Sequence, residues 1–127
     1  MSPSTRFGKP EVGPSQVRGE VLAIRRSGDY HVLVFAAPGV AELTSPGNFV
    51  AIAVGGQPSA MLLRRCFSIH QVDTAGALGG TVEIVVDAHG PGTKWLVDRD
   101  QGDSLDVIAP LGRPFSLPKE PVPCVLV

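Results

Sequence analysis

Cysteine, net charge and long apolar runs are all scarce in this chain of 127 residues. Its two cysteines, Cys66 and Cys124, lie far apart in no metal-binding or disulfide pattern, so no metal is assigned to them. The net charge of −1 leaves no overall positive field to hold nucleic acid or an anionic membrane. No apolar run approaches the ~20 residues that cross a bilayer, and the first residues contain no apolar signal segment. These absences exclude nucleic acid and membrane as expected partners and indicate a cytoplasmic protein.

Glycine and proline, in contrast, are abundant, with 15 and 12 residues. Glycine loses much backbone entropy in a helix and proline lacks the N–H that a helix needs, so a helical bundle is excluded. Hydrophobic residues make up 43% of the chain and charged residues 18%, which is enough apolar material for a folded core. The length fits one domain of the usual ~100 to 200 residues.

Alternating and β-branched runs, separated by glycine-rich and proline-rich turns, predict six short strands. We expect one helical turn within residues 38–43 and one short helix over residues 94–98, with Thr93 as its N-cap. The spacing of the turns favours an all-β fold, a small closed antiparallel barrel. The strands are expected at residues 17–25, 30–36, 48–54, 62–72, 81–86 and 105–109.

The two ends of the chain depart from this pattern. Residues 1–15 are polar and rich in proline and glycine, so we expect a flexible lead-in that buries too little apolar area to offset its ordering entropy. Residues 16–118 are expected to form the barrel. Residues 119–127 open an apolar run typical of a buried parallel strand, so we expect them to begin a second domain that is truncated at Val127.

Two segments are candidates for binding an anion. Arg64 and Arg65 lie within one predicted strand and must point to opposite faces. One can stay solvated, whereas the other needs an anionic partner such as a phosphate, although two surface arginines are the simpler alternative. The turn at residues 90–93 offers free N–H groups to a phosphate, or is only a glycine-rich turn. Phe67 and Ser68 suit a flavin ring, or are a core residue and a hydroxyl bonded to the backbone. The three histidines form no recognisable catalytic triad.

In order along the chain, four segments resemble motifs of the FAD-binding domain of the ferredoxin reductase superfamily, and most closely those of dihydroorotate dehydrogenase B electron transfer subunits. Residues 45–50 (SPGNFV) resemble the family's PGQFV strand, and residues 63–69 (LRRCFSI) its LRRPISI segment. Residues 90–93 (GPGT) resemble its GxGT turn, and residues 102–112 (GDSLDVIAPLG) its GDxLDVLGPLG stretch. The resemblance covers roughly residue 16 to the end. It implies a six-stranded antiparallel Greek-key barrel, in agreement with the strand pattern.

The resemblance also implies FAD as the cofactor, and assigns it to residues of three segments. Arg65 would pair with the pyrophosphate, and Gly92 and Thr93 would hold the phosphates from the helix side. The remaining residues implied to line or contact the cofactor are Cys66, Phe67, Ser68, Val85, Val86 and Asp87. No residue is assigned a catalytic role. In this family a pyridine-nucleotide domain and a cysteine-rich segment with a two-iron two-sulfur cluster follow, so NAD and the cluster would bind only in regions absent from this chain. Residues 119–127 resemble the first strand of that nucleotide domain.

The implied function is that of a flavin-dependent oxidoreductase subunit. It would pass electrons between a dihydroorotate dehydrogenase catalytic subunit and NAD, through an iron–sulfur cluster and FAD, in pyrimidine biosynthesis. This chain alone is expected not to oxidise NADH. One alternative is the FAD domain of another reductase subunit, serving a hydrogenase or an oxygenase. The other is a cofactor-free barrel used as an interaction module.

Overall fold

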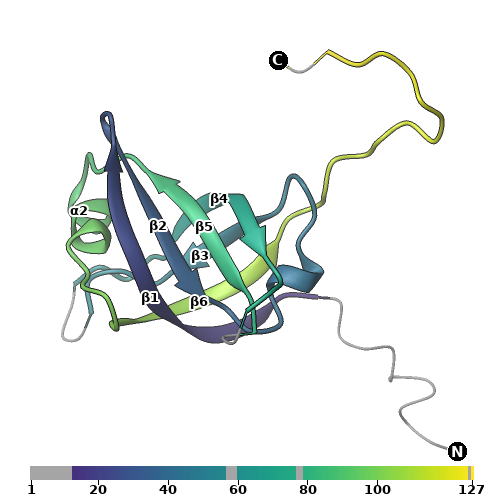
Figure 1. The fold of residues 1–127 in the computed structure, drawn as a ribbon. Helices are drawn as coiled ribbons and strands as arrows, with labels where there is room; N and C mark the ends of the chain where they lie inside the picture. Colours follow the sequence, from purple (N-terminus) through teal and green to yellow (C-terminus); the bar gives the residue numbers. More distant parts are fainter. Residues whose placement is uncertain (1–12, 57–59, 77–78, 126) are drawn as a thin grey trace, which may run out of the picture.

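A computed structural model describes residues 13–56, 60–76, 79–125 and 127. Six strands form a closed barrel in which every pair of neighbours is antiparallel, in the order β1-β2-β5-β4-β3-β6 (Figure 1). Since β2 pairs with β5 and β3 with β6, long connections cross the barrel in Greek-key fashion, which confirms the predicted fold class. The strands are β1 (Ser15–Ser27), β2 (Tyr30–Ala36), β3 (Phe49–Ile52), β4 (Arg65–Asp73), β5 (Thr81–Val86) and β6 (Ser104–Leu111).

The barrel interior is filled by aliphatic side chains and one phenylalanine. Along each strand, alternate residues point inward, as in β2, where Leu33 and Phe35 are fully buried. Gly19 of β1 lies against the Phe35 ring, and a Cβ there would approach Cδ2 of that ring to 2.9 Å. The absence of a side chain at residue 19 therefore allows a large aromatic ring into a narrow barrel.

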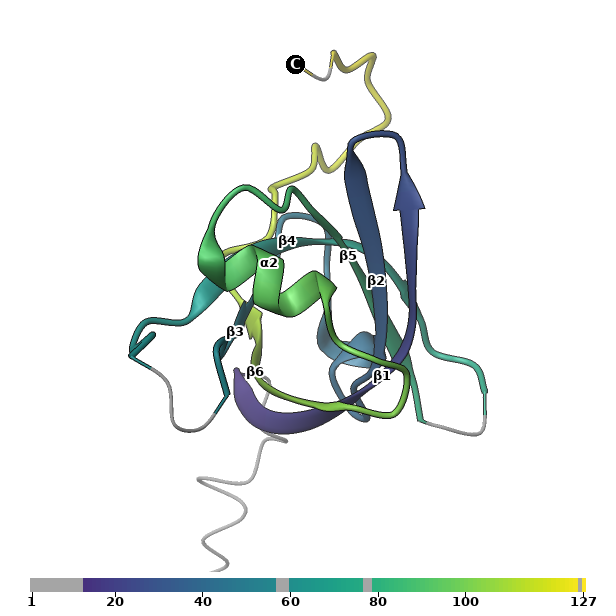
Figure 2. The ribbon, with the colours of Figure 1, turned by 90° about the vertical axis from the view of Figure 1, so that its left-hand side faces the viewer.

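Helix α2 (Pro91–Val97) lies across one end of the barrel (Figure 2). Of its side chains, Leu96 is fully buried and Trp95 is partly buried. The predicted start of the helix was wrong: Gly90 is the N-cap, and Thr93 lies three residues further on. Proline at the first helical position explains the early start, since its fixed φ suits a helix and its missing N–H needs no partner there. The short helix η1 (Ala41–Leu43) confirms the turn expected within residues 38–43.

Strand β4 begins at Arg65, three residues later than predicted. Leu62 and Leu63 precede it as an exposed apolar pair, with 89% and 76% of their surface accessible. Their apolar character was therefore a misleading strand signal. The entry into β4 is held by polar contacts instead of by burial.

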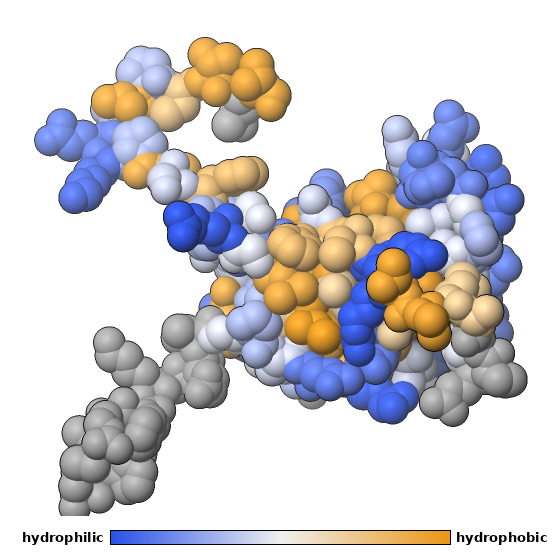
Figure 3. Space-filling view, turned by 180° about the vertical axis from the view of Figure 1, so that it is seen from behind, coloured by the Kyte–Doolittle hydropathy of each residue, from blue (hydrophilic) through white to orange (hydrophobic). Residues whose placement is uncertain are grey.

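The first described residues soon enter a strand, whereas the last described residues form no helix or strand. Ser15, within the predicted lead-in, already pairs with Ala109 of β6, and residues 1–12 lie outside the described residues. Beyond β6, residues 113–125 form no helix or strand and leave the barrel at the end opposite α2 (Figure 1). The space-filling view shows this tail extending away from the body of the barrel (Figure 3). The N–H of Phe115 donates to the Pro46 carbonyl oxygen at 2.9 Å, which ties the start of this tail to the barrel. Among the described helices, none has the length and apolar character of a membrane span.

Candidate functional site

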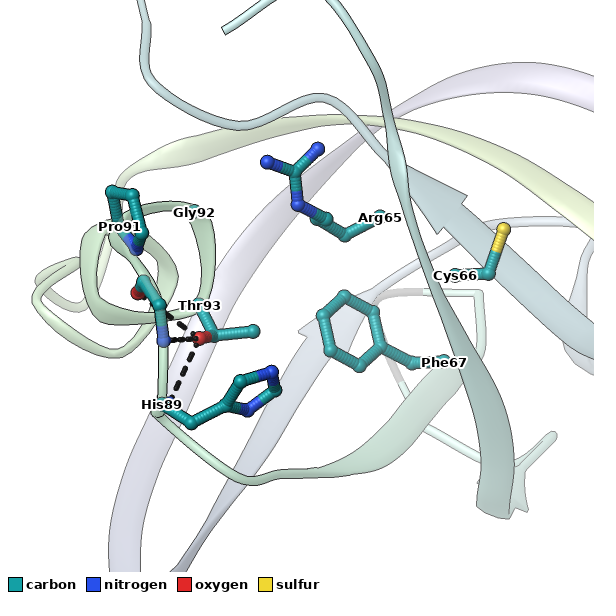
Figure 4. Close-up of a pocket in the computed structure, with 8 residues that line it drawn as sticks. Arg65, Cys66, Phe67, His89, Pro91, Gly92 and Thr93 are labelled. Carbon is teal, nitrogen blue, oxygen red and sulfur yellow. Dashed lines mark hydrogen bonds between the residues drawn. The ribbon is translucent and has the colours of Figure 1, made fainter.

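A cavity of about 210 Å³ separates the beginning of β4 from the beginning of α2 (Figure 4). The guanidinium of Arg65 points from β4 toward Gly92, and the Phe67 ring points toward His89 and Thr93, whereas Cys66 points away from the helix. The lining residues are Arg65, Cys66, Phe67, His89, Gly90, Pro91, Gly92 and Thr93. Two of the segments singled out by the sequence thus face each other across one cavity.

Thr93 holds the loop that enters the helix. Its hydroxyl accepts hydrogen bonds from the N–H groups of His89 and Gly90, each at 3.1 Å, and donates to the Gly90 carbonyl oxygen at 3.2 Å. These bonds satisfy two backbone N–H groups at the helix entry and fix the shape of the loop. Thr93 is therefore engaged within the loop that lines the cavity.

Arg65 carries a charge that is not neutralised by any carboxylate in the part of the chain that the structure describes. No salt bridge of the described residues includes it, and its Nη1 donates to the Leu63 carbonyl oxygen at 2.7 Å. The preceding arginine, Arg64, is bonded to Asp106 at 3.0 Å. A Cβ at Gly92 would lie 2.9 Å from Arg65 Nε, so the glycine permits the close approach of the guanidinium. The cation at the cavity is thus available to an anion.

A second cavity, of about 420 Å³, runs along the outer face of β4. Both polar residues, such as Ser68, and apolar ones, such as Val85 of β5, line it. The lining residues are Cys66, Phe67, Ser68, Ile69, His70 and Val85. Since Cys66 and Phe67 line both cavities, the cavity that holds the Arg65 guanidinium and the cavity along β4 are adjacent.

The structure brings together seven of the nine predicted site residues and leaves two aside, since Val86 and Asp87 line neither cavity. The Val86 side chain is fully buried in the core, so any contact with a ligand must come from its main chain. Asp87 turns toward His89, whose N–H donates to its carbonyl oxygen at 3.0 Å. Direct contact of these two side chains with a cofactor stays a prediction.

Sequence reasoning missed several lining residues. His89 and Pro91 line the first cavity, and Ile69 and His70 line the second. A signal existed for each pair, because Ile69 and His70 continue the strand that holds Ser68 and His89 directly precedes the glycine-rich turn. Within the described part of the chain, no three His, Cys, Asp or Glu side chains are grouped so as to hold a metal ion.

Curated relatives match a large part of the chain. Over 88 residues it is 36% identical to the dihydroorotate dehydrogenase B (NAD(+)) electron transfer subunit of Desulforamulus reducens, a match that covers 69% of this chain and 32% of that protein. It is 40% identical over 85 residues to the subunit of the same name from Bacillus cereus, with coverages of 67% and 31%. The chain thus spans about a third of the length of these relatives. No family model matches it.

Solved structures share the barrel. An NADH-dependent reduced ferredoxin–NADP oxidoreductase aligns with a TM-score of 0.63 at 24% identity, covering 77% of this chain and 35% of the other. The FAD/NAD binding domain of a nitric oxide dioxygenase from Vibrio cholerae aligns with a TM-score of 0.61 at 22% identity, with coverages of 81% and 46%. The ferredoxin reductase of carbazole 1,9a-dioxygenase aligns at 0.62 and 21%, with coverages of 81% and 32%.

The chain therefore folds as a barrel of the type found in the FAD-binding domains of ferredoxin reductases. Within that class, its sequence is homologous to part of the electron transfer subunits of dihydroorotate dehydrogenase B.

Proposed function

We propose that this chain is the FAD-binding domain of a dihydroorotate dehydrogenase electron transfer subunit. In the whole subunit, FAD would relay electrons between an iron–sulfur cluster and NAD, with the dihydroorotate dehydrogenase catalytic subunit as redox partner in pyrimidine biosynthesis. The names of the relatives support this proposal. The observation in the molecule that carries it is the Arg65 guanidinium, outside every salt bridge of the described residues, in a cavity adjacent to a second cavity of mixed lining.

The two adjacent cavities suit the two chemical parts of FAD. The pyrophosphate is anionic and requires a cation, which Arg65 supplies in the first cavity. The isoalloxazine ring has apolar faces and polar edges, and the second cavity is lined by apolar residues, among them the exposed Val85, and by the polar Ser68 and His70. The helix has only seven residues, so the proposal rests on the guanidinium and not on the helix end.

Each residue has a distinct part in holding the cofactor. Arg65 donates charge-assisted hydrogen bonds to the pyrophosphate, and Gly92 leaves room for that guanidinium. Thr93 keeps the loop that lines the cavity in shape through its hydrogen bonds to His89 and Gly90. Ser68 supplies a hydroxyl to the polar edge of the ring, and Cys66 lies between the two parts. When bound, FAD supplies the exchange of a hydride for single electrons, a chemistry that no side chain offers.

The remaining parts of the reaction belong to regions outside this chain. We place the cluster and the NAD site there, and we assign residues 119–127 to the start of the pyridine-nucleotide domain. Both cysteines are free and exposed, which suits the reducing cytoplasm. The purified chain is then expected not to reduce an artificial acceptor with NADH. Turnover at an enzyme-like rate would contradict this assignment.

Titration with FAD tests the proposal directly. The chain is purified, and binding is followed by the visible absorption and the fluorescence of the flavin. Arg65→Ala removes a hydrogen bond to a charged group, worth about 1.5 to 3 kcal/mol, so we expect the Kd to rise at least about tenfold. Arg25→Ala is the matched control, because Arg25 is an exposed arginine that contacts Glu83 at 3.5 Å and lines neither cavity.

The possible outcomes separate the rival functions. A folded protein that ignores FAD would contradict the proposal and favour a cofactor-free interaction module. Equal losses in the Arg65 and Arg25 variants would refute the assigned pyrophosphate contact. A stable complex with a hydrogenase or an oxygenase, but not with the dihydroorotate dehydrogenase catalytic subunit, would overturn the proposed partner.

A further inference from the structure

Arg64 makes three polar contacts just before β4 begins. Its Nη2 lies 3.0 Å from Oδ1 of Asp106, and its Nη1 donates to the Asp106 carbonyl oxygen at 2.9 Å. Nη1 also lies 3.5 Å from the Ala51 carbonyl oxygen. Ala51 belongs to β3 and Asp106 to β6, two strands that pair with each other. Arg64 therefore connects the residues just before β4 to the paired strands β3 and β6.

The Asp106 carboxylate that contacts Arg64 is also hydrogen-bonded by a residue of β1. Gln16 of β1 donates its side-chain N–H to Oδ1 of Asp106 at 2.9 Å. Burial raises the pKa of the Asp106 carboxyl. The hydrogen bonds from Gln16 and Arg64, together with the charges of Arg64 and Arg18, outweigh burial and hold the pKa of Asp106 below its ordinary value. The partner of Arg64 is therefore ionised at neutral pH.

The short stretch before β4 lies between Met61, which packs against the core, and Arg65, which pairs with β3. Leu62 and Leu63 are exposed, so hydrophobic burial does not fix their conformation. The carbonyl oxygen of Leu63 nevertheless accepts the hydrogen bond of Arg65 Nη1 at 2.7 Å. The direction of the Arg65 side chain thus depends on a main-chain segment whose polar anchor is Arg64.

We infer that Arg64 is a positioning residue, which acts through Arg65 to aim its guanidinium at the anion site beside Gly92. The inference rests on the proposed function and extends it to a residue that never touches the cofactor. Successive side chains of an extended segment point to opposite sides, so fixing one arginine against β6 sets the direction of the next. Preorganisation of this kind lowers the ordering cost that an anion would otherwise have to offset.

A double-mutant cycle tests the coupling between the two arginines. We expect Arg64→Gln to raise the Kd for FAD about tenfold in the wild-type background and to have little further effect in the presence of Arg65→Gln. Arg64→Lys restores the charge pair with Asp106 but not the fork to the carbonyl oxygens, so it should recover only part of the affinity. Arg25→Gln, the matched control, should leave the Kd unchanged. An equal loss from Arg64→Gln in both backgrounds would overturn the inference.

A second measurement needs no cofactor and so separates this inference from the proposed function. In protein labelled with ¹⁵N-arginine, the Nε–H resonance of Arg65 reports the order of its guanidinium. We expect Arg64→Gln to shift it and speed its exchange with solvent, whereas Arg25→Gln leaves it unchanged. An unaltered Arg65 resonance would refute the positioning role, whether or not the wild-type chain binds FAD.

A milder variant covers the case in which Arg64→Gln does not fold. Asp106→Asn removes the ion pair but keeps the carbonyl oxygen that accepts from Nη1. It is expected to perturb the Arg65 resonance in the same direction and to a smaller extent. If both Asp106→Asn and a folded Arg64→Lys leave that resonance unchanged, the inference is wrong.

Discussion

Replacing Gly92 with alanine separates the position of Arg65 from the stability of α2. A Cβ at this residue would lie 2.9 Å from Arg65 Nε, 3.2 Å from its Cζ and 3.1 Å from Cγ2 of Val54. Alanine is favoured over glycine within a helix by about 0.5 to 1 kcal/mol. The buried Val54 must yield slightly, at an overpacking cost of about 1 kcal/mol. These opposing effects nearly cancel, so the free energy of unfolding should stay within about 1 kcal/mol of wild type.

The Arg65 side chain, in contrast, is flexible enough to move away from the new methyl group. Its charge-assisted bond to an anion, worth about 1.5 to 3 kcal/mol, is then lost or weakened. The Kd for FAD should therefore rise about tenfold to hundredfold, while stability is nearly constant.

Flavin fluorescence titration and urea denaturation measure these two effects on the same protein. Gly13→Ala is the control, since a Cβ at residue 13 meets no atom within 4 Å. Wild-type FAD affinity in folded Gly92→Ala would refute the argument that this glycine makes room for the guanidinium. A large loss of stability would show that Val54, and not Arg65, absorbs the clash.

Three further predictions concern stability. Thr93→Ala removes the hydroxyl that accepts two N–H groups and should lower the unfolding free energy by about 1 kcal/mol, whereas Thr93→Ser should retain it; equal thermal midpoints would contradict this. Gly19→Ala places a Cβ 2.9 Å from Phe35 Cδ2 and 3.0 Å from the Ala36 carbonyl oxygen, so it should cost about 1 to 3 kcal/mol in urea denaturation, and an unchanged midpoint would refute the packing argument. The pKa of Asp106 is lowered in the fold, so its contribution is present above its unfolded pKa and disappears as pH falls through the folded pKa. The stability gap between wild type and Asp106→Asn should therefore close in acid, and a gap that widens as pH falls would contradict the sign.

Much of the barrel could be predicted from local patterns. The strands Tyr30–Ala36 and Thr81–Val86 have the predicted bounds, because dense β-branched runs end at turn residues on both sides. The start of β4 could not be predicted in this way. Leu62 and Leu63 carry the same apolar signal as a strand, although both are exposed, and pairing with β3 begins only at Arg65, opposite Ile52.

The sequence singled out most of the residues that line the two cavities, but their arrangement could not be predicted from it. That the two arginines face opposite ways follows from strand alternation. Strand alternation does not show which of the two arginines pairs with a carboxylate, because Asp106 lies 42 residues from Arg64 in the sequence. Thr93 was recognised as a helix-entry residue, yet its place within the helix depends on how early Pro91 allows the helix to begin. Side-chain burial, decided by the whole barrel, separates Val86 from its exposed neighbour Val85.

Closure of the barrel limits the ways in which another polypeptide can bind to it. Each of the six strands is hydrogen-bonded to a neighbour on both sides, so an incoming chain cannot add a strand to the sheet. Any partner protein must therefore be recognised through side chains, loops and the tail after β6. Such a surface can change by substitution while the main-chain framework stays constant, and binding specificity can diverge without any change in the sheet that positions Arg65.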